Sequence, residues 1–565
     1  MKTKLAAFIS GLYKTYKYSI AFGTLLFVLS LFFRISYINT YVLAGESEYN
    51  DSLFKHLFFS ALNAFILFSP LIIFSKTFLR IPVVVVLAFL ASFDVGLIYF
   101  YKAPMNEAVI ASVFESNMTE ATGVLLHLAF VWLPAFGLFG FLALKASLEI
   151  NRGLKRFILL PSACLLADVT ALFVLPLLTT LTYFEKKDPS LILMNIRTSS
   201  FIAYFSEKVS PKYPFIIGDM FLAGTYLEQM TRFNGIEEKG MPSGVVFRPD
   251  TITGARADKI ILVVGESARR ENHSLYGYPV KTTPFLDSLA SNKEYLSCFQ
   301  HVISPSNFTR DVLRMTFSYA TPSNGGLFLE YGNLLKMAKD AGYKTCWIST
   351  QDKFGSYNSI MNLIAKTADR RYFHTGSKAD DLELLPHIQS SVENGQRQFI
   401  VVHINGSHWP YHRFDGDDTK ALGSSDEVTD YNKTIRHTDR LLRGIYRIAG
   451  ALDENVLIYY YSDHGEIIGK TDSGYNMHGL SYKYKIQYHV PLVVMQNRPF
   501  IAADSIVNKY YDGQTGRLNT LSNIYILGEL MGFHVSDSLI EQSKIDGRYV
   551  LQGDGSCVLY EKIKD

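Results

Sequence analysis

Acidic and imidazole side chains follow several apolar runs in the second half of this 565-residue chain. Carboxylate and imidazole together suit a borderline divalent cation, zinc most simply and manganese next. A single histidine after a strand is usually an ordinary loop residue, but an Asp-His pair, a glutamate and two more histidines in such positions predict a metal site. The candidates are Glu266, His408, Asp463, His464 and, 14 residues beyond the last, His478.

A hydroxyl nucleophile could come from the segment 304–313, which lies between the Glu266 strand and the next predicted helix. Serine and threonine hydroxyls attack poorly at neutral pH unless a metal or a base activates them. A helix N-terminus in this segment would also favour a bound anion. The local sequence leaves Thr309, Ser304 and Ser306 open as the nucleophile, and N-capping by Ser306 or Thr309 is the alternative.

These side chains need a frame that brings several strand ends together. Continuous apolar runs predict buried strands at 259–264, 343–349, 398–404, 455–461 and 490–495. Amphipathic stretches predict helices at 331–341, 430–452 and 516–531. The alternation predicts an α/β domain with a mostly parallel sheet sandwiched by helices. In such sheets the active site forms at the carboxyl ends of the strands.

The first 184 residues have a different composition. The whole chain is 48% hydrophobic and only 19% charged, whereas soluble proteins carry about a quarter charged residues. The deficit concentrates in five apolar runs near the length of a membrane span, at 18–33, 57–75, 81–101, 121–144 and 157–178. We therefore expect a five-helix transmembrane domain at 1–180, a partly membrane-surface connector at 181–250 and a catalytic domain at 251–565.

Basic residues in the loops predict the orientation of these spans. Ten lysines and arginines would fall on the N-terminal side of the membrane and three on the other. The N-terminus is then cytoplasmic, and five crossings place everything after about residue 180 outside the cytoplasm. Arg34, just past the first run, is expected to snorkel towards the interface. Asp94 and Asp168 lie inside spans, and either a structural contact or a functional role is open for them.

Charge and cysteine content exclude other classes of protein. The net charge of +3 is small for this length and offers no basic field for nucleic acid. Four cysteines without CxxC spacing are too few for a disulfide scaffold, and a bridge between Cys298 and Cys346 stays open.

Three short motifs carry a resemblance to a known family. They are VGESAR at 264–269, SLYGYP at 274–279 with TTP at 282–284, and SDHGE at 462–466. Together they resemble the signature of bacterial phosphoethanolamine transferases, in the alkaline phosphatase/sulfatase superfamily. That family includes the lipid A and lipopolysaccharide-core enzymes and the mobile colistin-resistance proteins. The resemblance covers nearly the whole chain, from the membrane spans to the C-terminal domain.

The resemblance implies a role for each matching position. The primary zinc ligands would be Glu266, Thr309, Asp463 and His464, with Thr309 as the nucleophile. The outer histidines His408 and His478 would bind substrate phosphate or a second zinc ion and supply a catalytic proton. Further substrate contacts are implied for Asn333 and, in the membrane half, for Asn117 and Glu120, which resemble an Asn-x-x-Glu motif that handles the lipid donor.

Two departures concern the subtype. Lipid A enzymes flank the nucleophile with a disulfide, but here Cys298 lies eleven residues before Thr309 and Arg314-Met315 stand where a second cysteine would follow. The chain is therefore more similar to members that act on the lipopolysaccharide core. The Cys-x-Pro/Ser-x-Arg signature of sulfatases is absent, which argues against sulfate ester hydrolysis.

The expected reaction is transfer of phosphoethanolamine from phosphatidylethanolamine to a lipopolysaccharide acceptor or another glycolipid, at a zinc site in the periplasm of a Gram-negative bacterium. One zinc ion is expected, a second is possible, and Mn²⁺ is the less favoured metal. The protein is expected to act as a monomer among membrane lipids. The alternatives are a phosphoglycerol transferase on the same scaffold, a catalytically dead membrane sensor and a transporter.

Overall fold

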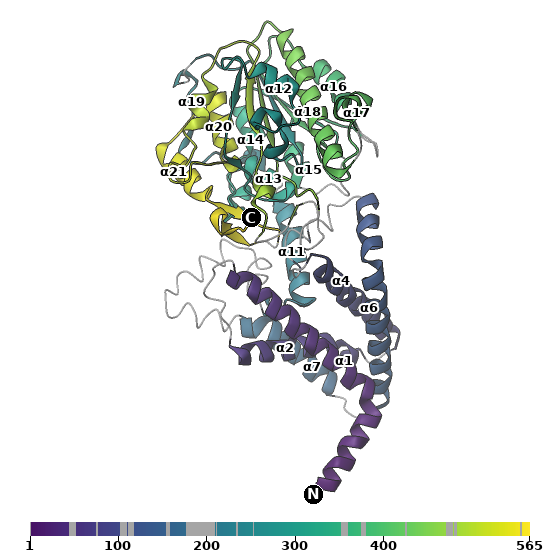
Figure 1. Ribbon diagram of the computed structural model, residues 1–565. Helices are drawn as coiled ribbons and strands as arrows, with labels where there is room; N and C mark the ends of the chain where they lie inside the picture. The colour runs from purple at the N-terminus through teal and green to yellow at the C-terminus, as the bar shows by residue number, and fades with distance from the viewer. Residues whose placement is uncertain are drawn as a thin grey trace. The chain divides into compact units, whose positions relative to one another are not determined.

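The computed structural model of the protein separates into two compact units, Met1–Thr231 and Arg232–Asp565 (Figure 1). The structure describes all residues except 1, 44–51, 75–76, 102–104, 106–109, 111–117, 154–158, 177–208, 211, 233–235, 252–253, 352–359, 375–379, 424–425, 470–477, 480–482 and 554–555.

Within the described residues of the first unit, four helices are long and apolar enough to cross a membrane. Their apolar stretches are Tyr13–Ile38, Leu53–Ile73, Phe78–Tyr99 and Ala129–Ile150. They belong to α1 (Lys2–Leu43), α2 (Leu53–Phe68) with α3 (Pro70–Ile73), α4 (Thr77–Tyr101) and α6 (Met118–Gly153). The fifth expected span is not confirmed, because its described part is the shorter apolar helix formed by α7 (Leu160–Val169) and η3 (Thr170–Val174).

Buried polar side chains of this unit bind the backbone just before α11 (Ile217–Arg232). Arg34 of α1 donates to the Lys212 carbonyl at 3.1 Å, and Asp94 of α4 accepts from the Ile216 N–H at 3.1 Å. Arg34 is 2% exposed, so the expectation that it snorkels is wrong. Asp168 accepts a hydrogen bond from the Ser69 hydroxyl. Both intramembrane acids therefore have structural partners, as unpaired polar groups there would be costly.

The second unit is built on a seven-stranded sheet with the order β3-β9-β8-β2-β7-β5-β6. Five neighbouring strands are parallel: β8 (Val456–Ser462), β2 (Lys259–Gly265), β7 (Gln398–His403), β5 (Lys344–Ser349) and β6 (Arg370–Phe373). At one edge β9 (Leu492–Gln496) and β3 (Leu296–Cys298) pair antiparallel. The predicted α/β class and five apolar strands are confirmed, with β9 running against its neighbours.

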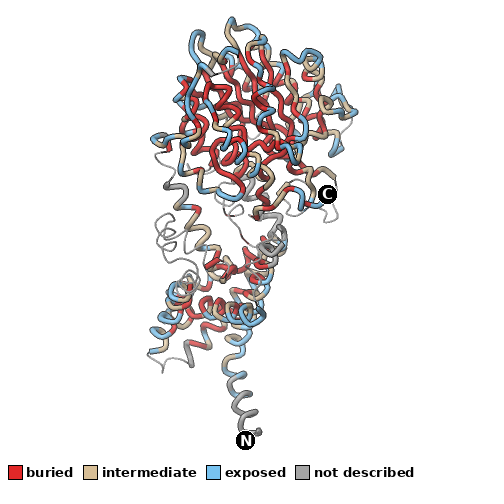
Figure 2. Tube along the Cα trace, turned by 90° about the vertical axis from the view of Figure 1, so that its left-hand side faces the viewer, coloured by how far each residue is buried: buried red, intermediate tan, exposed pale blue. Residues whose placement is uncertain are grey.

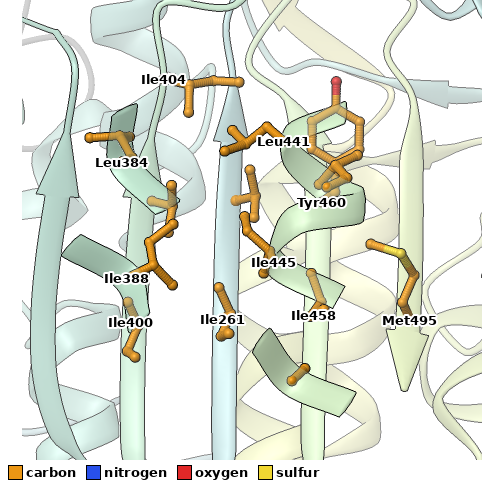
Figure 3. Packing of buried hydrophobic residues seen from close by; sticks show 14 of the residues in the cluster. Ile261, Leu384, Ile388, Ile400, Ile404, Leu441, Ile445, Ile458, Tyr460 and Met495 are labelled. Atoms are coloured by element: carbon orange, nitrogen blue, oxygen red, sulfur yellow. The ribbon is translucent and has the colours of Figure 1, made fainter. Parts of the chain in front are cut away.

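One face of the sheet packs against α12 (Pro284–Leu289), α16 (Leu384–Ser391) and α18 (Glu427–Gly450). Figure 3 shows the strand residues Ile261, Ile400 and Ile458 beneath Ile388 of α16 and Ile445 of α18. These apolar side chains are buried completely. Burial of apolar surface stabilises the fold by about 25 cal/mol per Å². This packing holds the strands, and therefore the strand ends that carry the site, in fixed positions.

The other face is covered by α13 (Thr309–Thr316), α14 (Leu334–Asp340), α15 (Ile360–Lys366) and α20 (Asn523–Met531). Alternate residues of β8 point to this side, where Tyr461 donates to Thr316 of α13 and Tyr459 to Asn523 of α20. Figure 2 shows buried residues running the length of the strands. The hydroxyl partners anchor α13, whose first residue is Thr309.

Smaller elements complete the unit. Three two-stranded pairings are β1 (Val245–Phe247) with β11 (Phe533–Val535), β4 (Val302–Ile303) with β10 (Leu518–Asn519), and β12 (Tyr549–Leu551) with β13 (Cys557–Leu559). The remaining helices are α17 (Gly416–Leu422), α19 (Ala503–Asn508) and α21 (Asp537–Asp546). Cys298 and Cys346 are free thiols and do not form a disulfide with each other.

Candidate active site

Three acidic and imidazole side chains meet at the carboxyl ends of two adjacent strands. Glu266 follows β2 directly, Asp463 and His464 follow β8, and Gly265 pairs with Ser462 in the register of these strands. One ligand atom from each of the three side chains lies within 4.8 Å of the others. All three residues are buried, at 1% exposure or less. The sheet therefore assembles a ligand set for one metal ion from two segments far apart in sequence.

The electrostatics of this set call for a cation. Asp463 Oδ2 is buried without a hydrogen-bond partner in the described part of the chain, and His464 Nε2 lies 3.3 Å from it. Burial, and next the Glu266 carboxylate, raise the pKa of Asp463 well above its ordinary value. Two buried carboxylates cannot both ionise cheaply without a positive partner. The orphaned oxygen and the oxygen–nitrogen donor set fit a zinc ion.

Neighbouring groups fix the orientation of each ligand. Ser267 donates from its hydroxyl to Glu266 Oε1 at 2.9 Å, and the Ser267 and His464 N–H groups donate to Asp463 Oδ1 at 2.9 and 2.7 Å. His464 Nδ1 lies 2.9 Å from the Gly465 carbonyl, which leaves Nε2 free to face the cluster. Burial alone would raise the pKa of Glu266, but the rings of His464, His408 and His478 lower it to about 2.

Thr309 places its hydroxyl on this ligand set. Its Oγ1 lies 3.3 and 3.2 Å from the two Glu266 oxygens and 3.2 Å from His464 Nε2. Thr309 is the first residue of α13, and the N-cap position belongs to Phe308, which makes no side-chain cap. Helix capping therefore does not account for a threonine at position 309. Its hydroxyl sits where a metal ion would lower its pKa, and beside N–H groups that favour an anion.

The other two candidate nucleophiles lie apart from these contacts. Ser304 accepts a hydrogen bond from the Ser306 N–H at 3.4 Å, and the Ser306 hydroxyl is buried without a hydrogen-bond partner in the described residues. Neither hydroxyl contacts Glu266, Asp463 or His464 in the described part of the chain. The geometry favours Thr309 among the three residues that the sequence left open.

The two outer histidines lie next to the ligand set. The His478 ring centroid is 4.1 Å from that of His464 and 6.4 Å from that of His408. Burial, and next the His464 ring, lower the pKa of His478 well below its ordinary value. A neutral imidazole there can accept or pass on a proton. Glu466, two residues beyond His464, is fully buried, and burial raises its pKa to about 8.

A buried aspartate positions the loop that carries His408. Asp381 accepts hydrogen bonds from the Asn405 and Gly406 N–H groups at 3.0 and 2.9 Å. Gly406 has a φ of +49°, and a Cβ there would lie 2.9 Å from the Glu266 carbonyl. Only glycine fits this left-handed turn against the β2 end without strain. Sequence reasoning missed Asp381, which stands outside every motif.

A second group of potential ligands is already neutralised. Asp415, Asp418 and His437 bring ligand atoms within 4.8 Å of one another. The Arg440 guanidinium, however, donates to both Asp415 and Asp418, at 2.6 and 2.9 Å. His437 contacts a carboxylate through each ring nitrogen, Asp418 and Asp380, both at 2.7 Å. This cluster is a buried ion-pair network in which the protein supplies the cations.

The remaining substrate candidates are placed differently. Asn333 is the N-cap of α14, where it accepts from the Lys336 N–H at 2.9 Å and donates to Thr367 Oγ1 at 3.0 Å. The oxygen and the nitrogen of its amide thus both have partners within the protein, and the side chain is 1% exposed. Asn117 and the Glu120 side chain lie outside the described residues. Gln351, which the sequence analysis did not consider, donates to Glu266 Oε2 at 2.9 Å.

Known proteins resemble this chain in its C-terminal half and over longer stretches. Residues 258–515 match the model of the Sulfatase family. The chain is 28% identical over 290 residues to phosphoethanolamine transferase EptC of Escherichia coli O18:K1:H7, an alignment that covers 47% of this chain. The match covers 49% of that relative, so this chain spans about half of its length. It is 26% identical over 435 residues to phosphoethanolamine transferase EptA of Helicobacter pylori, covering 72% of this chain and 74% of that one.

A solved structure extends the likeness to the membrane helices. The integral membrane protein lipooligosaccharide phosphoethanolamine transferase A of Neisseria meningitidis matches with a TM-score of 0.54 and 18% identity. The match covers 92% of this chain and 98% of that one. The two chains therefore share a fold in which apolar helices precede the α/β unit.

Proposed function

We propose that this chain, whose residues 258–515 match the model of the Sulfatase family, is a zinc-dependent phosphoethanolamine transferase acting from phosphatidylethanolamine on a lipopolysaccharide acceptor, a core sugar or lipid A. The observation that carries the proposal is the contact of the Thr309 hydroxyl with Glu266 and His464, at 3.2 Å for the nearer Glu266 oxygen and for the imidazole nitrogen. Relatives named as phosphoethanolamine transferases support the choice of substrate.

The residues that would hold zinc are Glu266, Asp463, His464 and Thr309. A bound zinc ion would supply Lewis-acid stabilisation of the threonine oxyanion at neutral pH. The protein adds the fixed orientation of each ligand, through Ser267, Gln351 and the backbone N–H groups described above. One ion accounts for the ligand set at the strand ends, and a second is not required by it.

The first half-reaction is an in-line displacement. Thr309 Oγ1 forms a bond to phosphorus while the bond from phosphorus to the diacylglycerol oxygen breaks. His478 or His408 takes up the proton that Thr309 Oγ1 loses and donates it to the leaving alkoxide. Diacylglycerol departs, and phosphoethanolamine stays as an ester of Thr309. His408, His478 and the N–H groups at the start of α13 contact the phosphoryl oxygens.

The second half-reaction reverses these roles. A hydroxyl or phosphate oxygen of the acceptor attacks phosphorus, and the bond to Thr309 Oγ1 breaks. The same histidine takes the proton from an acceptor hydroxyl. The threonine oxygen returns to its ligand set, and the acceptor carries phosphoethanolamine. Its added amine lowers the negative charge of the outer surface, which would weaken binding of cationic peptides such as polymyxin.

Membrane attachment suits this chemistry. Donor and acceptor are both lipids, so tethering the catalytic unit raises their effective concentration at the site. We place the protein in the inner membrane of a Gram-negative bacterium, as a monomer with a cytoplasmic N-terminus and a periplasmic catalytic domain. Asn117 and Glu120 are proposed to contact the donor lipid. A phosphoglycerol transferase would use the same ligand set, and a dead sensor would lack an intact one.

Mass spectrometry of lipopolysaccharide from cells with and without the protein tests the proposal. The expected result is a mass gain of one phosphoethanolamine unit, lost in Thr309→Ala. Ser306→Ala is the matched control, because it removes a nearby buried hydroxyl without a contact to the ligand set in the described residues, and it should keep the gain. A gain of phosphoglycerol, or a gain that persists in Thr309→Ala, would overturn the assignment.

A further inference from the structure

Gln487 is a fully buried glutamine that contacts two loops of the active site. It is 0% exposed. Its main-chain carbonyl accepts from the Gly465 N–H at 2.8 Å, and Gly465 follows His464, a proposed metal ligand. Its side-chain Oε1 accepts from Asn307 Nδ2 at 3.1 Å, two residues before Thr309. Gln487 therefore joins the loop that carries His464 to the loop that leads to the proposed nucleophile.

The nitrogen of the same amide fixes the side chain within its own segment. Nε2 of Gln487 donates to the Lys483 carbonyl at 2.8 Å and lies 3.3 Å from the Tyr484 carbonyl. Tyr484 has a φ of +64°, a left-handed conformation that residues other than glycine adopt at a cost. An amide suits this position because its oxygen accepts and its nitrogen donates. The oxygen of Gln487 is thus held facing Asn307.

The main chain next to Gln487 makes a second connection to the nucleophile loop. The Ser304 N–H donates to the Tyr488 carbonyl at 2.7 Å, which joins the start of that loop to the same segment. The Asn307 contact extends this connection to within two residues of Thr309. The Asn307 side chain is also 0% exposed. The hydrogen bond between the two amides is therefore shielded from water, which strengthens it.

The position of Thr309 depends on how these loops are held. Thr309 Oγ1 lies 3.2 Å from His464 Nε2, although the two residues are 155 positions apart in the sequence. At the far end of α13, Tyr461 of β8 donates a hydrogen bond to Thr316 and anchors the helix. At its near end, the side-chain contact of Asn307 is the corresponding anchor. Since a displacement of about 1 Å can slow a reaction by about 100-fold, loss of the near anchor should lower the rate of transfer.

We propose that Gln487 is a positioning residue for the transfer reaction, whose amide holds Asn307 so that Thr309 Oγ1 stays on the ligand set. This inference rests on the proposed function and adds a residue that acts through the nucleophile loop. Gln487 binds neither zinc nor substrate in this role. Its loss should therefore lower kcat and leave KM and the zinc content unchanged. A purely structural role would lower the Tm without a selective loss of kcat.

Kinetics of the full chain, loaded with zinc in detergent micelles, test the assignment. Gln487→Leu keeps a side chain of similar size and removes both ends of the amide. Its kcat for diacylglycerol release from phosphatidylethanolamine should fall by about 10- to 100-fold, with KM and bound zinc as in wild type.

Gln398→Leu is the matched control for Gln487→Leu. Gln398 is 1% exposed, and its amide accepts from the Glu393 N–H at 2.7 Å and donates to the Ser391 carbonyl at 2.9 Å. It is the first residue of β7, at the opposite end of the strand from the site. Gln398→Leu should lower the Tm in the same way as Gln487→Leu but keep the wild-type kcat.

A double variant shows whether Gln487 acts through Asn307. If it does, Asn307→Ala combined with Gln487→Leu should be about as slow as Gln487→Leu alone. Two effects that simply multiply would overturn the proposal. It is also wrong if Gln487→Leu loses zinc, or if its kcat falls no further than that of Gln398→Leu.

If Gln487→Leu does not fold, Gln487→Glu replaces it. A buried carboxyl group without a cation has a raised pKa, and its neutral form can accept from Asn307 and donate to the Lys483 carbonyl. The kcat of Gln487→Glu relative to wild type should therefore rise as the pH falls, and a ratio that is the same at every pH would overturn the proposal. If wild type itself releases no diacylglycerol, the proposed function fails, which this measurement distinguishes from a failure of the Gln487 assignment alone.

Discussion

Gln351 donates a hydrogen bond from its side-chain amide to Glu266 Oε2 at 2.9 Å, and the same nitrogen lies 3.0 Å from the Ile404 carbonyl. The amide thus ties the end of β5 to Glu266, the proposed metal ligand after β2, and to the loop after β7. Gln351 is 6% exposed. Partners of this kind, one step away from a metal, fix the orientation of the ligands and tune their affinity.

Replacing Gln351 by alanine is expected to weaken zinc binding by about 10- to 100-fold, because Glu266 loses the donor that orients it. The affinity is measured by competition with a fluorescent zinc chelator. Gln300→Ala is the matched control, since Gln300 is exposed. An unchanged zinc affinity in Gln351→Ala would show that Ser267 alone orients the carboxylate.

Removing the metal from the purified protein is expected to lower its Tm. Glu266 and Asp463 would then face each other without a cation, and one of them must take up a proton. A ligand present at about 100 times its Kd stabilises by about 2.7 kcal/mol, which corresponds to roughly 4 °C for a unit of this size.

The measurement is a thermal melt in detergent with and without a chelator. Added zinc should restore the original Tm. Asp463→Asn should melt at similar temperatures in both conditions, because it has lost a ligand. A wild-type Tm that is the same with and without the chelator would argue against a contribution of the metal to stability.

The ligand set could be predicted from the sequence because each member directly follows an apolar strand. Glu266 and the Asp463–His464 pair stand at such ends, and parallel strands bring their carboxyl ends to one edge. The pairing of β2 with β8 could not be read from the sequence, since paired residues such as Gly265 and Ser462 are 197 positions apart. An apolar run also has no direction, so nothing in 490–495 indicated that β9 is antiparallel.

Residues that orient the site residues, or that only resemble substrate contacts, are harder to identify from the sequence. Gln351 follows a predicted strand, as the ligands do, but an uncharged amide does not stand out as a metal or catalytic group. Asp381 is far in sequence from the His408 loop that it binds. Asn333 drew attention as a potential substrate contact, although asparagine before an apolar helical run is also the ordinary N-cap. In each case the decisive information is a tertiary contact.

The His437 imidazole is expected to stabilise the fold at acidic and neutral pH. Burial alone would lower its pKa, but hydrogen bonds to Asp380 and Asp418 raise it to about 9. The folded value lies above the ordinary value of 6.5. The contribution is therefore complete below about pH 6.5 and is lost as pH rises through about 9. This rise in the pKa of His437 corresponds to at most roughly 3 kcal/mol of folding stability.

Thermal melts of wild type and His437→Gln between pH 6 and 10 measure this effect. The difference in Tm should be largest at pH 6 and should shrink towards pH 10, where the imidazole is neutral. His534→Gln changes an exposed histidine that has no ion pair among the described residues, and it should give no such trend. A difference that grows with pH would mean that His437 is neutral in the fold.

Gly465→Ala is expected to disrupt the site from its backbone. The new Cβ would lie 2.2 Å from the Ile486 carbonyl oxygen and 2.9 Å from that of His489, and backbone atoms cannot move aside as a flexible side chain can. The substitution should cost about 3 kcal/mol or more and displace both His464 and Glu466. We expect a lower Tm and loss of diacylglycerol release.

Gly450→Ala is the matched control for this substitution. A Cβ at position 450, the last residue of α18, meets no atom within 4 Å. Alanine there should be neutral or should stabilise by up to about 1 kcal/mol, because it lowers the entropy of the unfolded chain and favours the helix. If both variants keep wild-type activity and Tm, the strand-end loop after β8 can shift, and the tight approach of Gly465 to Ile486 does not hold His464 in place.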